Sequence, residues 1–189
     1  MSEAGRNLRD DVHDILISEE RLQARTREIA QDIAKDYRQI DDLLLICVLK
    51  GAFVFLADLS RELDRPHHLD FMGVSSYGAS TVSSGAVRIV MDLKDDIAGR
   101  NVLIVEDIID SGRTLDYLIR TLLARSPASM RICSLLSKPS RREVDVPIDY
   151  LGFEIPDEFV VGYGLDFGEI YRNLPYIAVL KSEIFADFV

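Results

Sequence analysis

The sequence has no tryptophan and only two cysteines among its 189 residues. Two cysteines cannot build the disulfide framework of a small secreted domain, and Cys47 and Cys133 lack the spacing of a metal site. Both lie within apolar segments, LLLICVL and RICSLL, in which a small buried thiol is expected. The scarcity of cysteine therefore favours a reducing cytoplasm.

Long apolar runs are also missing. The longest, Leu43 to Leu49, is far too short to span a membrane, and the first residues, MSEAGRNLRDD, contain no apolar signal core. We therefore expect a cytoplasmic protein with no membrane partner. The first 17 residues match no motif.

Basic side chains are the minority, with 22 Lys and Arg against 32 Asp and Glu, for a net charge of −10. This balance argues against a broad nucleic-acid surface, so we expect no nucleic-acid partner. It does not exclude an anionic small molecule, because a few cations and backbone N–H groups can bind phosphate locally.

What the sequence does contain is an alternation of apolar strand-like runs with segments of helical period. Ser18 predicts a helix N-cap, and the apolar spacing that follows predicts a helix ending near Asp36. Further helices are expected within 50–63 and from Thr114. Strands are predicted at 43–49, 69–77, 86–92, 102–106 and 130–136, of which the first and the last are expected to be buried. The pattern predicts one α/β domain, residues 1–189, with a mainly parallel sheet, and the Gly- and Pro-broken pieces after residue 149 predict a small β cap.

The segment VLIVEDIIDSGRTL, residues 102–115, gathers carboxylates, hydroxyls and a glycine after an apolar strand. Ligands of open α/β sheets lie beyond the carboxyl ends of the strands, and a helix N-terminus favours an anion. The acids Glu106, Asp107 and Asp110 would repel a bare phosphate, so they suit sugar hydroxyls, a metal ion or a proton. A ribose phosphate with Mg²⁺ satisfies both halves of the segment.

This segment resembles the phosphoribosyl pyrophosphate motif of the type I phosphoribosyltransferases. The motifs LKGAFVFLADL, SSYG, LLSK, GFEIPDEFVVGYGLDF and YRNLPYIAVL resemble the hypoxanthine-guanine phosphoribosyltransferases, from about Leu45 to Leu180. The resemblance implies a twisted, mainly parallel sheet flanked by helices, the type I phosphoribosyltransferase fold. Its core would cover about 40–150, and a small hood would come from about 1–20 and 150–189. It also implies a homodimer or homotetramer.

The implied reaction joins hypoxanthine or guanine to 5-phosphoribosyl 1-pyrophosphate, releasing pyrophosphate and forming IMP or GMP, with Mg²⁺ as cofactor. Asp110 matches the proton acceptor at purine N7, and Glu106 and Asp107 match the pair that holds the ribose hydroxyls. The implied metal ligands are Glu106, Asp107 and Asp166. The sugar diphosphate is expected to meet Lys50, Gly51, Glu106, Asp107, Asp110, Ser111, Gly112, Arg113, Thr114 and Arg172.

For the purine, the resemblance implies that Lys138 reads the 6-oxo group, because a cation prefers oxygen to the adenine amino group. Phe159 matches the aromatic that stacks on the base, and Val160 matches the residue that offers backbone contacts to the edge of the base. Asp166 is the fourth residue expected at the purine. Ser76 and Tyr77 match the start of a mobile loop that excludes water.

Two alternatives stay open. One is a transferase for another base, which Lys138 and the FVVGYGLD segment disfavour. The other is a nucleotide-sensing RNA-binding regulator of the same superfamily, for which the acidic composition offers no obvious RNA face.

Overall fold

The computed structural model describes residues 7–76 and 87–185. They form a six-stranded sheet of order β4-β3-β2-β5-β6-β7 and a three-stranded sheet of order β1-β9-β8. The strands are β1 (Val12–Ile17), β2 (Leu43–Leu49), β3 (His68–Ser76), β4 (Val87–Met91), β5 (Asn101–Ile109), β6 (Ser129–Ser137), β7 (Tyr150–Glu154), β8 (Val160–Val161) and β9 (Ile177–Leu180). The helices are α1 (Glu19–Asp36), α2 (Phe53–Glu62), α3 (Arg113–Leu123) and α4 (Ser182–Phe185), with short 3-10 helices at Leu8–Asp11 and Pro139–Arg141.

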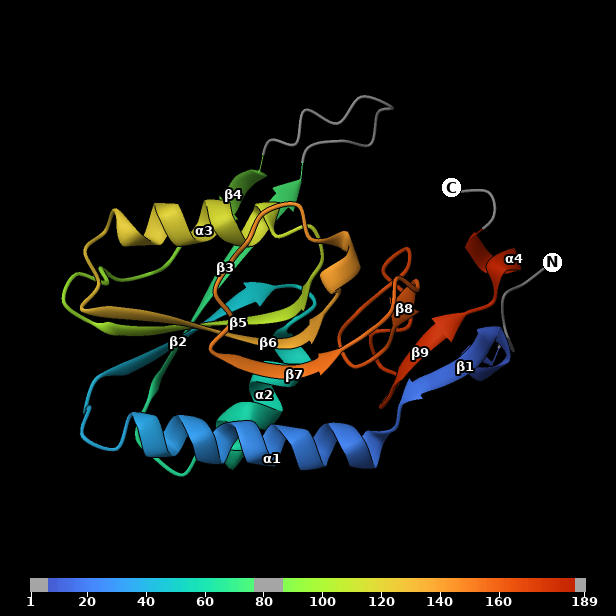
Figure 1. The fold of residues 1–189 in the computed structure, drawn as a ribbon, viewed down its shortest axis with the longest axis horizontal. Helices are drawn as coiled ribbons and strands as arrows, with labels where there is room; N and C mark the ends of the chain where they lie inside the picture. Colours follow the sequence, from blue (N-terminus) through green and yellow to red (C-terminus); the bar gives the residue numbers. More distant parts are fainter. Residues whose placement is uncertain (1–6, 77–86, 186–189) are drawn as a thin grey trace.

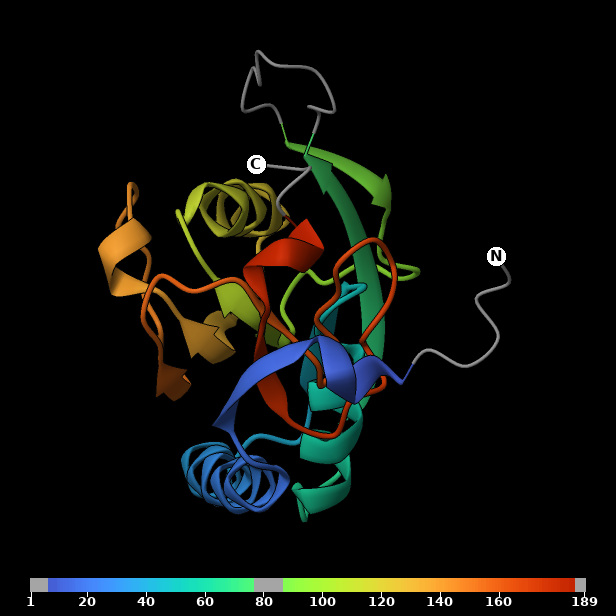
Figure 2. The ribbon, with the colours of Figure 1, turned by 90° about the vertical axis from the view of Figure 1, so that its right-hand side faces the viewer.

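The large sheet lies between two helical layers, with α3 on one face and α1 and α2 on the other (Figures 1 and 2). Strands β3, β2, β5, β6 and β7 are parallel, and β4 pairs with β3 as an antiparallel edge. The expected α/β class with a mainly parallel sheet is confirmed.

The central strands are apolar on both faces because both faces are covered. Leu45 and Cys47 of β2 belong to the core cluster under α1 and α2, while Leu44 and Ile46 belong to the cluster under α3. This explains why LLLICVL is a continuous apolar run and not an alternating one. Burial also raises the pKa of the Cys47 thiol to about 12, so the thiol stays protonated.

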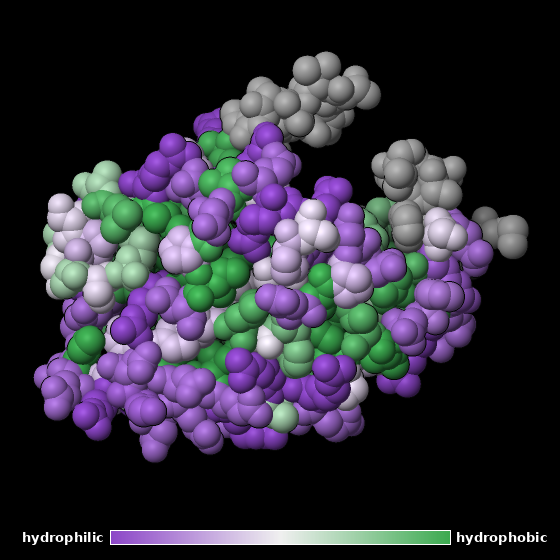
Figure 3. Space-filling view, viewed as in Figure 1, coloured by the Kyte–Doolittle hydropathy of each residue, from purple (hydrophilic) through white to green (hydrophobic). Residues whose placement is uncertain are grey.

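Helix α1 begins and ends where the sequence predicts. The Ser18 hydroxyl accepts a hydrogen bond from the Arg21 N–H, and Leu22 and Ile33 are buried on one face. The opposite face is charged, and Figure 3 shows this side of the molecule as a hydrophilic band. None of the described helices is both long and apolar enough to cross a membrane.

Three expectations need correction. Strand β5 does not end at Glu106 but continues to Ile109, because it pairs with β6 as far as Ser137. The segment Tyr150–Glu154 is not part of the β cap, since it pairs with β6 as the edge strand of the large sheet. Finally, β1 was not predicted at all.

The small sheet is the hood, and it brings the two ends of the described chain together. Strand β1 pairs with β9 in antiparallel fashion, with Val12 opposite Leu180 and Ile17 opposite Ile177, and β9 pairs with β8. Figure 1 shows this sheet beyond the carboxyl ends of the central strands. The fold therefore places the hood over the edge where the motif residues end.

Candidate active site

The junction between β5 and α3 is built around a glycine. Gly112 adopts φ +84°, and a Cβ there would lie 2.4 Å from the Val144 carbonyl oxygen. That close approach exists because the Ser111 carbonyl accepts hydrogen bonds from the backbone N–H groups of Glu143 and Val144, at 2.9 and 3.0 Å. Only glycine combines this left-handed conformation with this proximity.

A cavity of about 220 Å³ opens at this junction. Its walls come from the end of β2, the end of β5 and the first turn of α3, where backbone N–H groups are available to an anion. The Arg113 side chain is not aimed at this cavity, because it forms an ion pair with Glu143. The lining residues include Lys50, Gly51, Glu106, Asp107, Asp110, Ser111, Gly112 and Thr114.

The turn after β2 fits against an acidic side chain of β5. The peptide bond between Leu49 and Lys50 is cis. A Cβ at Gly51 would lie 1.5 Å from Asp107 Oδ2, so any larger residue would push the turn away from the carboxylate. The glycine in the LKG motif thus lets the Lys50 turn and Asp107 share one wall of the cavity.

The surroundings of the adjacent acids Glu106 and Asp107 disfavour their ionised forms. Burial, together with the neighbouring Asp107 charge, raises the pKa of the Glu106 carboxyl well above its usual value. Burial also raises the pKa of Asp107 to about 6, although the Ile108 N–H donates to its Oδ1 at 2.7 Å and opposes the rise. The positive charge of Arg172 also opposes the rise at Asp107, but burial outweighs it, so the neutral forms of both carboxyls are favoured relative to water.

Beside this cavity, four charged side chains form a network. Lys50 Nζ lies 3.0 Å from Glu169 Oε2, and Arg172 Nη2 lies 2.7 Å from Asp166 Oδ1 and 3.3 Å from Glu169 Oε2. Arg172 Nη1 also donates to the Gly164 carbonyl at 2.7 Å. The network therefore joins the turn after β2 to the segment between β8 and β9.

A second network lies at the end of β6. Lys138 is 9% exposed, and its Nζ lies 3.7 Å from Asp157 Oδ1. Arg141 lies between two acids, with Nε 3.3 Å from Asp110 Oδ1 and Nη1 3.7 Å from Asp157 Oδ2. The backbone N–H of Lys138 donates to the Ile109 carbonyl at 3.0 Å, which fixes this lysine beside the β5 loop.

Phe159 precedes the hood strand β8, and its ring is not core. It is 42% exposed and meets the Phe167 ring edge-on, with centroids 5.4 Å apart. Val160, by contrast, is buried in β8 opposite Val179. An exposed ring directly before a buried strand is suited to stack on a planar ligand.

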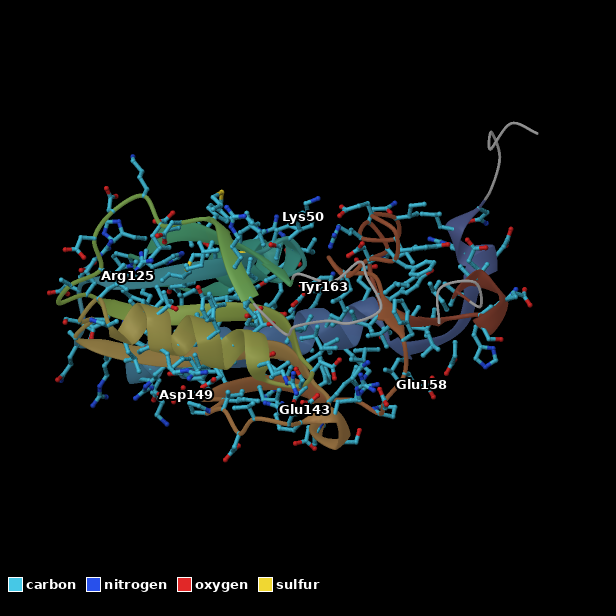
Figure 4. The ribbon with its side chains drawn as sticks, turned by 90° about the horizontal axis from the view of Figure 1, so that it is seen from above. Lys50, Arg125, Glu143, Asp149, Glu158 and Tyr163 are labelled. Carbon is cyan, nitrogen blue, oxygen red and sulfur yellow. The ribbon has the colours of Figure 1, made fainter. Side chains whose placement is uncertain are left out.

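Tyr163 links the segment between β8 and β9 to helix α2. It has φ +50° between Gly162 and Gly164, and its hydroxyl donates to Asp58 Oδ2 of α2 at 2.6 Å. A Cβ at Gly164 would lie 2.0 Å from the Gly51 carbonyl oxygen. Figure 4 shows Tyr163 and Lys50 at the end of the core that faces the hood, far from Arg125.

The structure thus collects the expected sugar-diphosphate residues around one cavity, except that Arg113 turns outward and Arg172 stands beside it. Lys138, Phe159, Val160 and Asp166 do not line this cavity and belong to the surrounding networks and hood. Ser76 ends β3, and Tyr77 lies outside the described residues. Four residues of these networks were not expected from the sequence: Arg141, Asp157, Tyr163 and Glu169. The basic pair in KPSRR, directly after β6, was the available signal for Arg141.

The chain matches the family described as phosphoribosyl transferase domain over residues 14–168. It is 51% identical to the hypoxanthine-guanine phosphoribosyltransferase of Mycobacterium tuberculosis over 93% of this chain and 89% of that protein. It is 50% identical to the Bacillus subtilis enzyme of the same name, over 94% of this chain and 98% of that protein. A solved hypoxanthine phosphoribosyltransferase from Staphylococcus aureus superposes with a TM-score of 0.90 at 43% identity, over 97% of this chain and 99% of that one. The chain therefore belongs to the hypoxanthine-guanine phosphoribosyltransferases of the phosphoribosyl transferase family.

Proposed function

We propose that this chain performs purine salvage by transferring a phosphoribosyl group from 5-phosphoribosyl 1-pyrophosphate to N9 of hypoxanthine or guanine. The bond from ribose C1 to the diphosphate oxygen breaks, its electron pair leaves with pyrophosphate, and N9 bonds to C1. The observation that carries the proposal is the pairing of Lys138 N–H with the Ile109 carbonyl, which sets a buried lysine beside the phosphate-type loop.

The sugar diphosphate would occupy the cavity beside α3. The backbone of Ser111 to Thr114 and the helix N-terminus suit the 5′-phosphate, since N–H groups and the helix dipole favour an anion. Glu106 and Asp107 are suited to the ribose hydroxyls, because a hydroxyl can donate to a buried carboxylate. Lys50 and Arg172 are proposed to bind the pyrophosphate portion.

The purine would lie between Phe159 and the second network. Lys138 would donate to the 6-oxo group, and Asp110 would accept the proton from N7 as N9 bonds to the sugar. Arg141, 3.3 Å from Asp110 in an exposed ion pair, would stay near that carboxylate as the base binds. Val160 would contribute backbone contacts to the edge of the base.

Mg²⁺ fits this site through oxygen donors. Magnesium is usually held by one or two carboxylates and substrate phosphates, and among the described residues no cluster of three potential ligands forms a closed metal site. Glu106 and Asp107 are the carboxylates proposed to hold one ion and Asp166 is proposed to hold a second, with the sugar diphosphate supplying other oxygens. When bound, the ions offset the charge of the departing pyrophosphate.

We further expect a homodimer or homotetramer in the cytoplasm. The edge of the large sheet exposes several apolar side chains that self-association could cover. These are Leu69, Phe71, Val90 and Met91.

A base panel tests the proposed function. Hypoxanthine, guanine, xanthine and adenine are each incubated with 5-phosphoribosyl 1-pyrophosphate, with and without Mg²⁺, and nucleotide and pyrophosphate are quantified. We expect IMP and GMP with equimolar pyrophosphate in the presence of Mg²⁺, and no AMP. RNA binding without nucleotide formation would instead support the regulator.

A further inference from the structure

Glu169 occupies the place between the two cations proposed to bind pyrophosphate. One carboxylate oxygen, Oε2, contacts both Lys50 at 3.0 Å and Arg172 at 3.3 Å. An anion that bridges two cations through an oxygen has the chemistry that a diphosphate oxygen would have there. Nothing in the proposed function uses this side chain.

The backbone of Glu169 is adapted to this position. Its φ is +66°, a left-handed conformation that residues other than glycine rarely adopt, and it follows Gly168 at φ +59°. Its N–H donates to Asp166 Oδ2 at 2.9 Å, which stabilises the turn. Such backbone conformations concentrate at functional sites when the surroundings maintain them.

The formal charges in this network cancel. Lys50 and Arg172 are positive, and Asp166 and Glu169 are negative, so the network itself carries no net charge to attract a free anion. Replacing Glu169 by a neutral side chain would leave one excess positive charge beside the cavity.

The two contacts of Glu169 differ in how easily they exchange. Lys50 and Glu169 are both exposed, with 66% and 64% of their side chains accessible, so their ion pair is weak. Arg172 is only 18% exposed and keeps its bonds to Asp166 and to the Gly164 carbonyl when Glu169 departs. A bound diphosphate can therefore displace Glu169 without disturbing Arg172.

We propose that Glu169 is a specificity-determining residue, an internal counter-anion that the diphosphate group must displace. It raises the selectivity of the site for a diphosphate that is also anchored through its sugar and its Mg²⁺, and it disfavours free pyrophosphate and inorganic phosphate. This inference rests on the proposed function, because that function assigns Lys50 and Arg172 to the diphosphate.

Calorimetric titration of the whole chain with pyrophosphate tests the inference. Glu169→Gln keeps the side-chain size and is expected to bind pyrophosphate about three- to tenfold more tightly without Mg²⁺, the range set by losing one or two exposed ion pairs. Glu28→Gln is the matched control. It removes the same charge and an exposed pair with Arg25 on α1, and its pyrophosphate affinity should equal that of the wild type.

A second variant identifies the cation that is responsible for the gain in pyrophosphate affinity. Adding Lys50→Gln to Glu169→Gln should abolish the gain, because the freed lysine supplies the extra attraction. Unchanged pyrophosphate affinity in Glu169→Gln would overturn the inference. Weaker binding in Mg²⁺ would also overturn it, since Glu169 would then act as a metal ligand.

The same titrations separate this inference from the proposed function. Wild-type IMP formation tests the transfer reaction, whereas the change in pyrophosphate affinity tests Glu169. Transfer without a gain in Glu169→Gln would refute only the inference. A gain without any nucleotide formation would refute only the transfer reaction.

Discussion

The proposed sugar-phosphate end and the proposed base end of the site are built in different ways. The first is a cavity shaped by two glycines, with Gly112 held against the Val144 carbonyl and Gly51 against the Asp107 carboxylate. The second consists of side chains from separate segments, including the half-exposed Phe159 and the exposed Arg141. We therefore expect the first half to be formed before the ligand arrives and the second to be organised by the base.

Asp110 joins the two halves, so its replacement should have the largest effect. Asp110→Asn removes the proposed proton acceptor and should lower kcat by about 10² to 10⁴, the usual contribution of a positioned acid or base. The sugar diphosphate should still bind, because the backbone of the loop remains. Single-turnover rates and calorimetry measure the two effects separately.

Asp116→Asn is the matched control for that prediction. Asp116 lies in the first turn of α3 and pairs with Arg120 on the helix surface. Its turnover should stay close to that of the wild type. Near wild-type turnover in Asp110→Asn as well would refute the assigned proton acceptor.

Gly112→Ala should disrupt the cavity that is proposed to bind the sugar diphosphate. The left-handed backbone and the contact with the Val144 carbonyl should together cost about 3 kcal/mol of unfolding free energy and raise the KM for the sugar diphosphate. Gly99→Ala is the control, because Gly99 has φ +74° with nothing within 4 Å of its Cβ position. It should cost only about 1 kcal/mol, with KM unchanged. Equal behaviour of the two variants in denaturant and in KM would contradict the argument.

Lys138→Ala tests the proposed base end of the site. Losing a hydrogen bond from a charged donor, worth about 1.5 to 3 kcal/mol, should lower kcat/KM for hypoxanthine and guanine about 10- to 100-fold. The KM for the sugar diphosphate should hardly change. Lys94→Ala, at an exposed lysine that follows β4, controls for the lost charge. Unchanged kcat/KM for both bases would remove Lys138 from the base site.

How much of the molecule can be predicted from the sequence depends on the same difference between contiguous and dispersed residues. The phosphate loop is contiguous in residues 106–114, so its acids, glycine and helix start could be predicted together. Much of the large sheet could also be predicted, because β2 and residues 102–105 of β5 are continuously apolar. The end of β5 was missed, since polar Asp107 can occupy a strand whose neighbour β6 continues beside it.

The ion-pair networks could not be predicted from the residues alone. Lys50 and Glu169 are separated by 119 positions and meet only because the hood folds over the sheet. A charged residue in a loop gives no sign of its partner. The edge strand β7 was assigned to the hood because it is short and precedes Pro156, and only its pairing with β6 reveals its place.

The most direct test is a pair of calorimetric titrations of the free wild-type chain, one with 5-phosphoribosyl 1-pyrophosphate and Mg²⁺, the other with guanine alone. A preformed sugar-phosphate half and an unassembled base half predict that the sugar diphosphate binds at least about tenfold more tightly than guanine, a difference of about 1.4 kcal/mol. Guanine binding to the free chain as tightly as the sugar diphosphate would contradict this account.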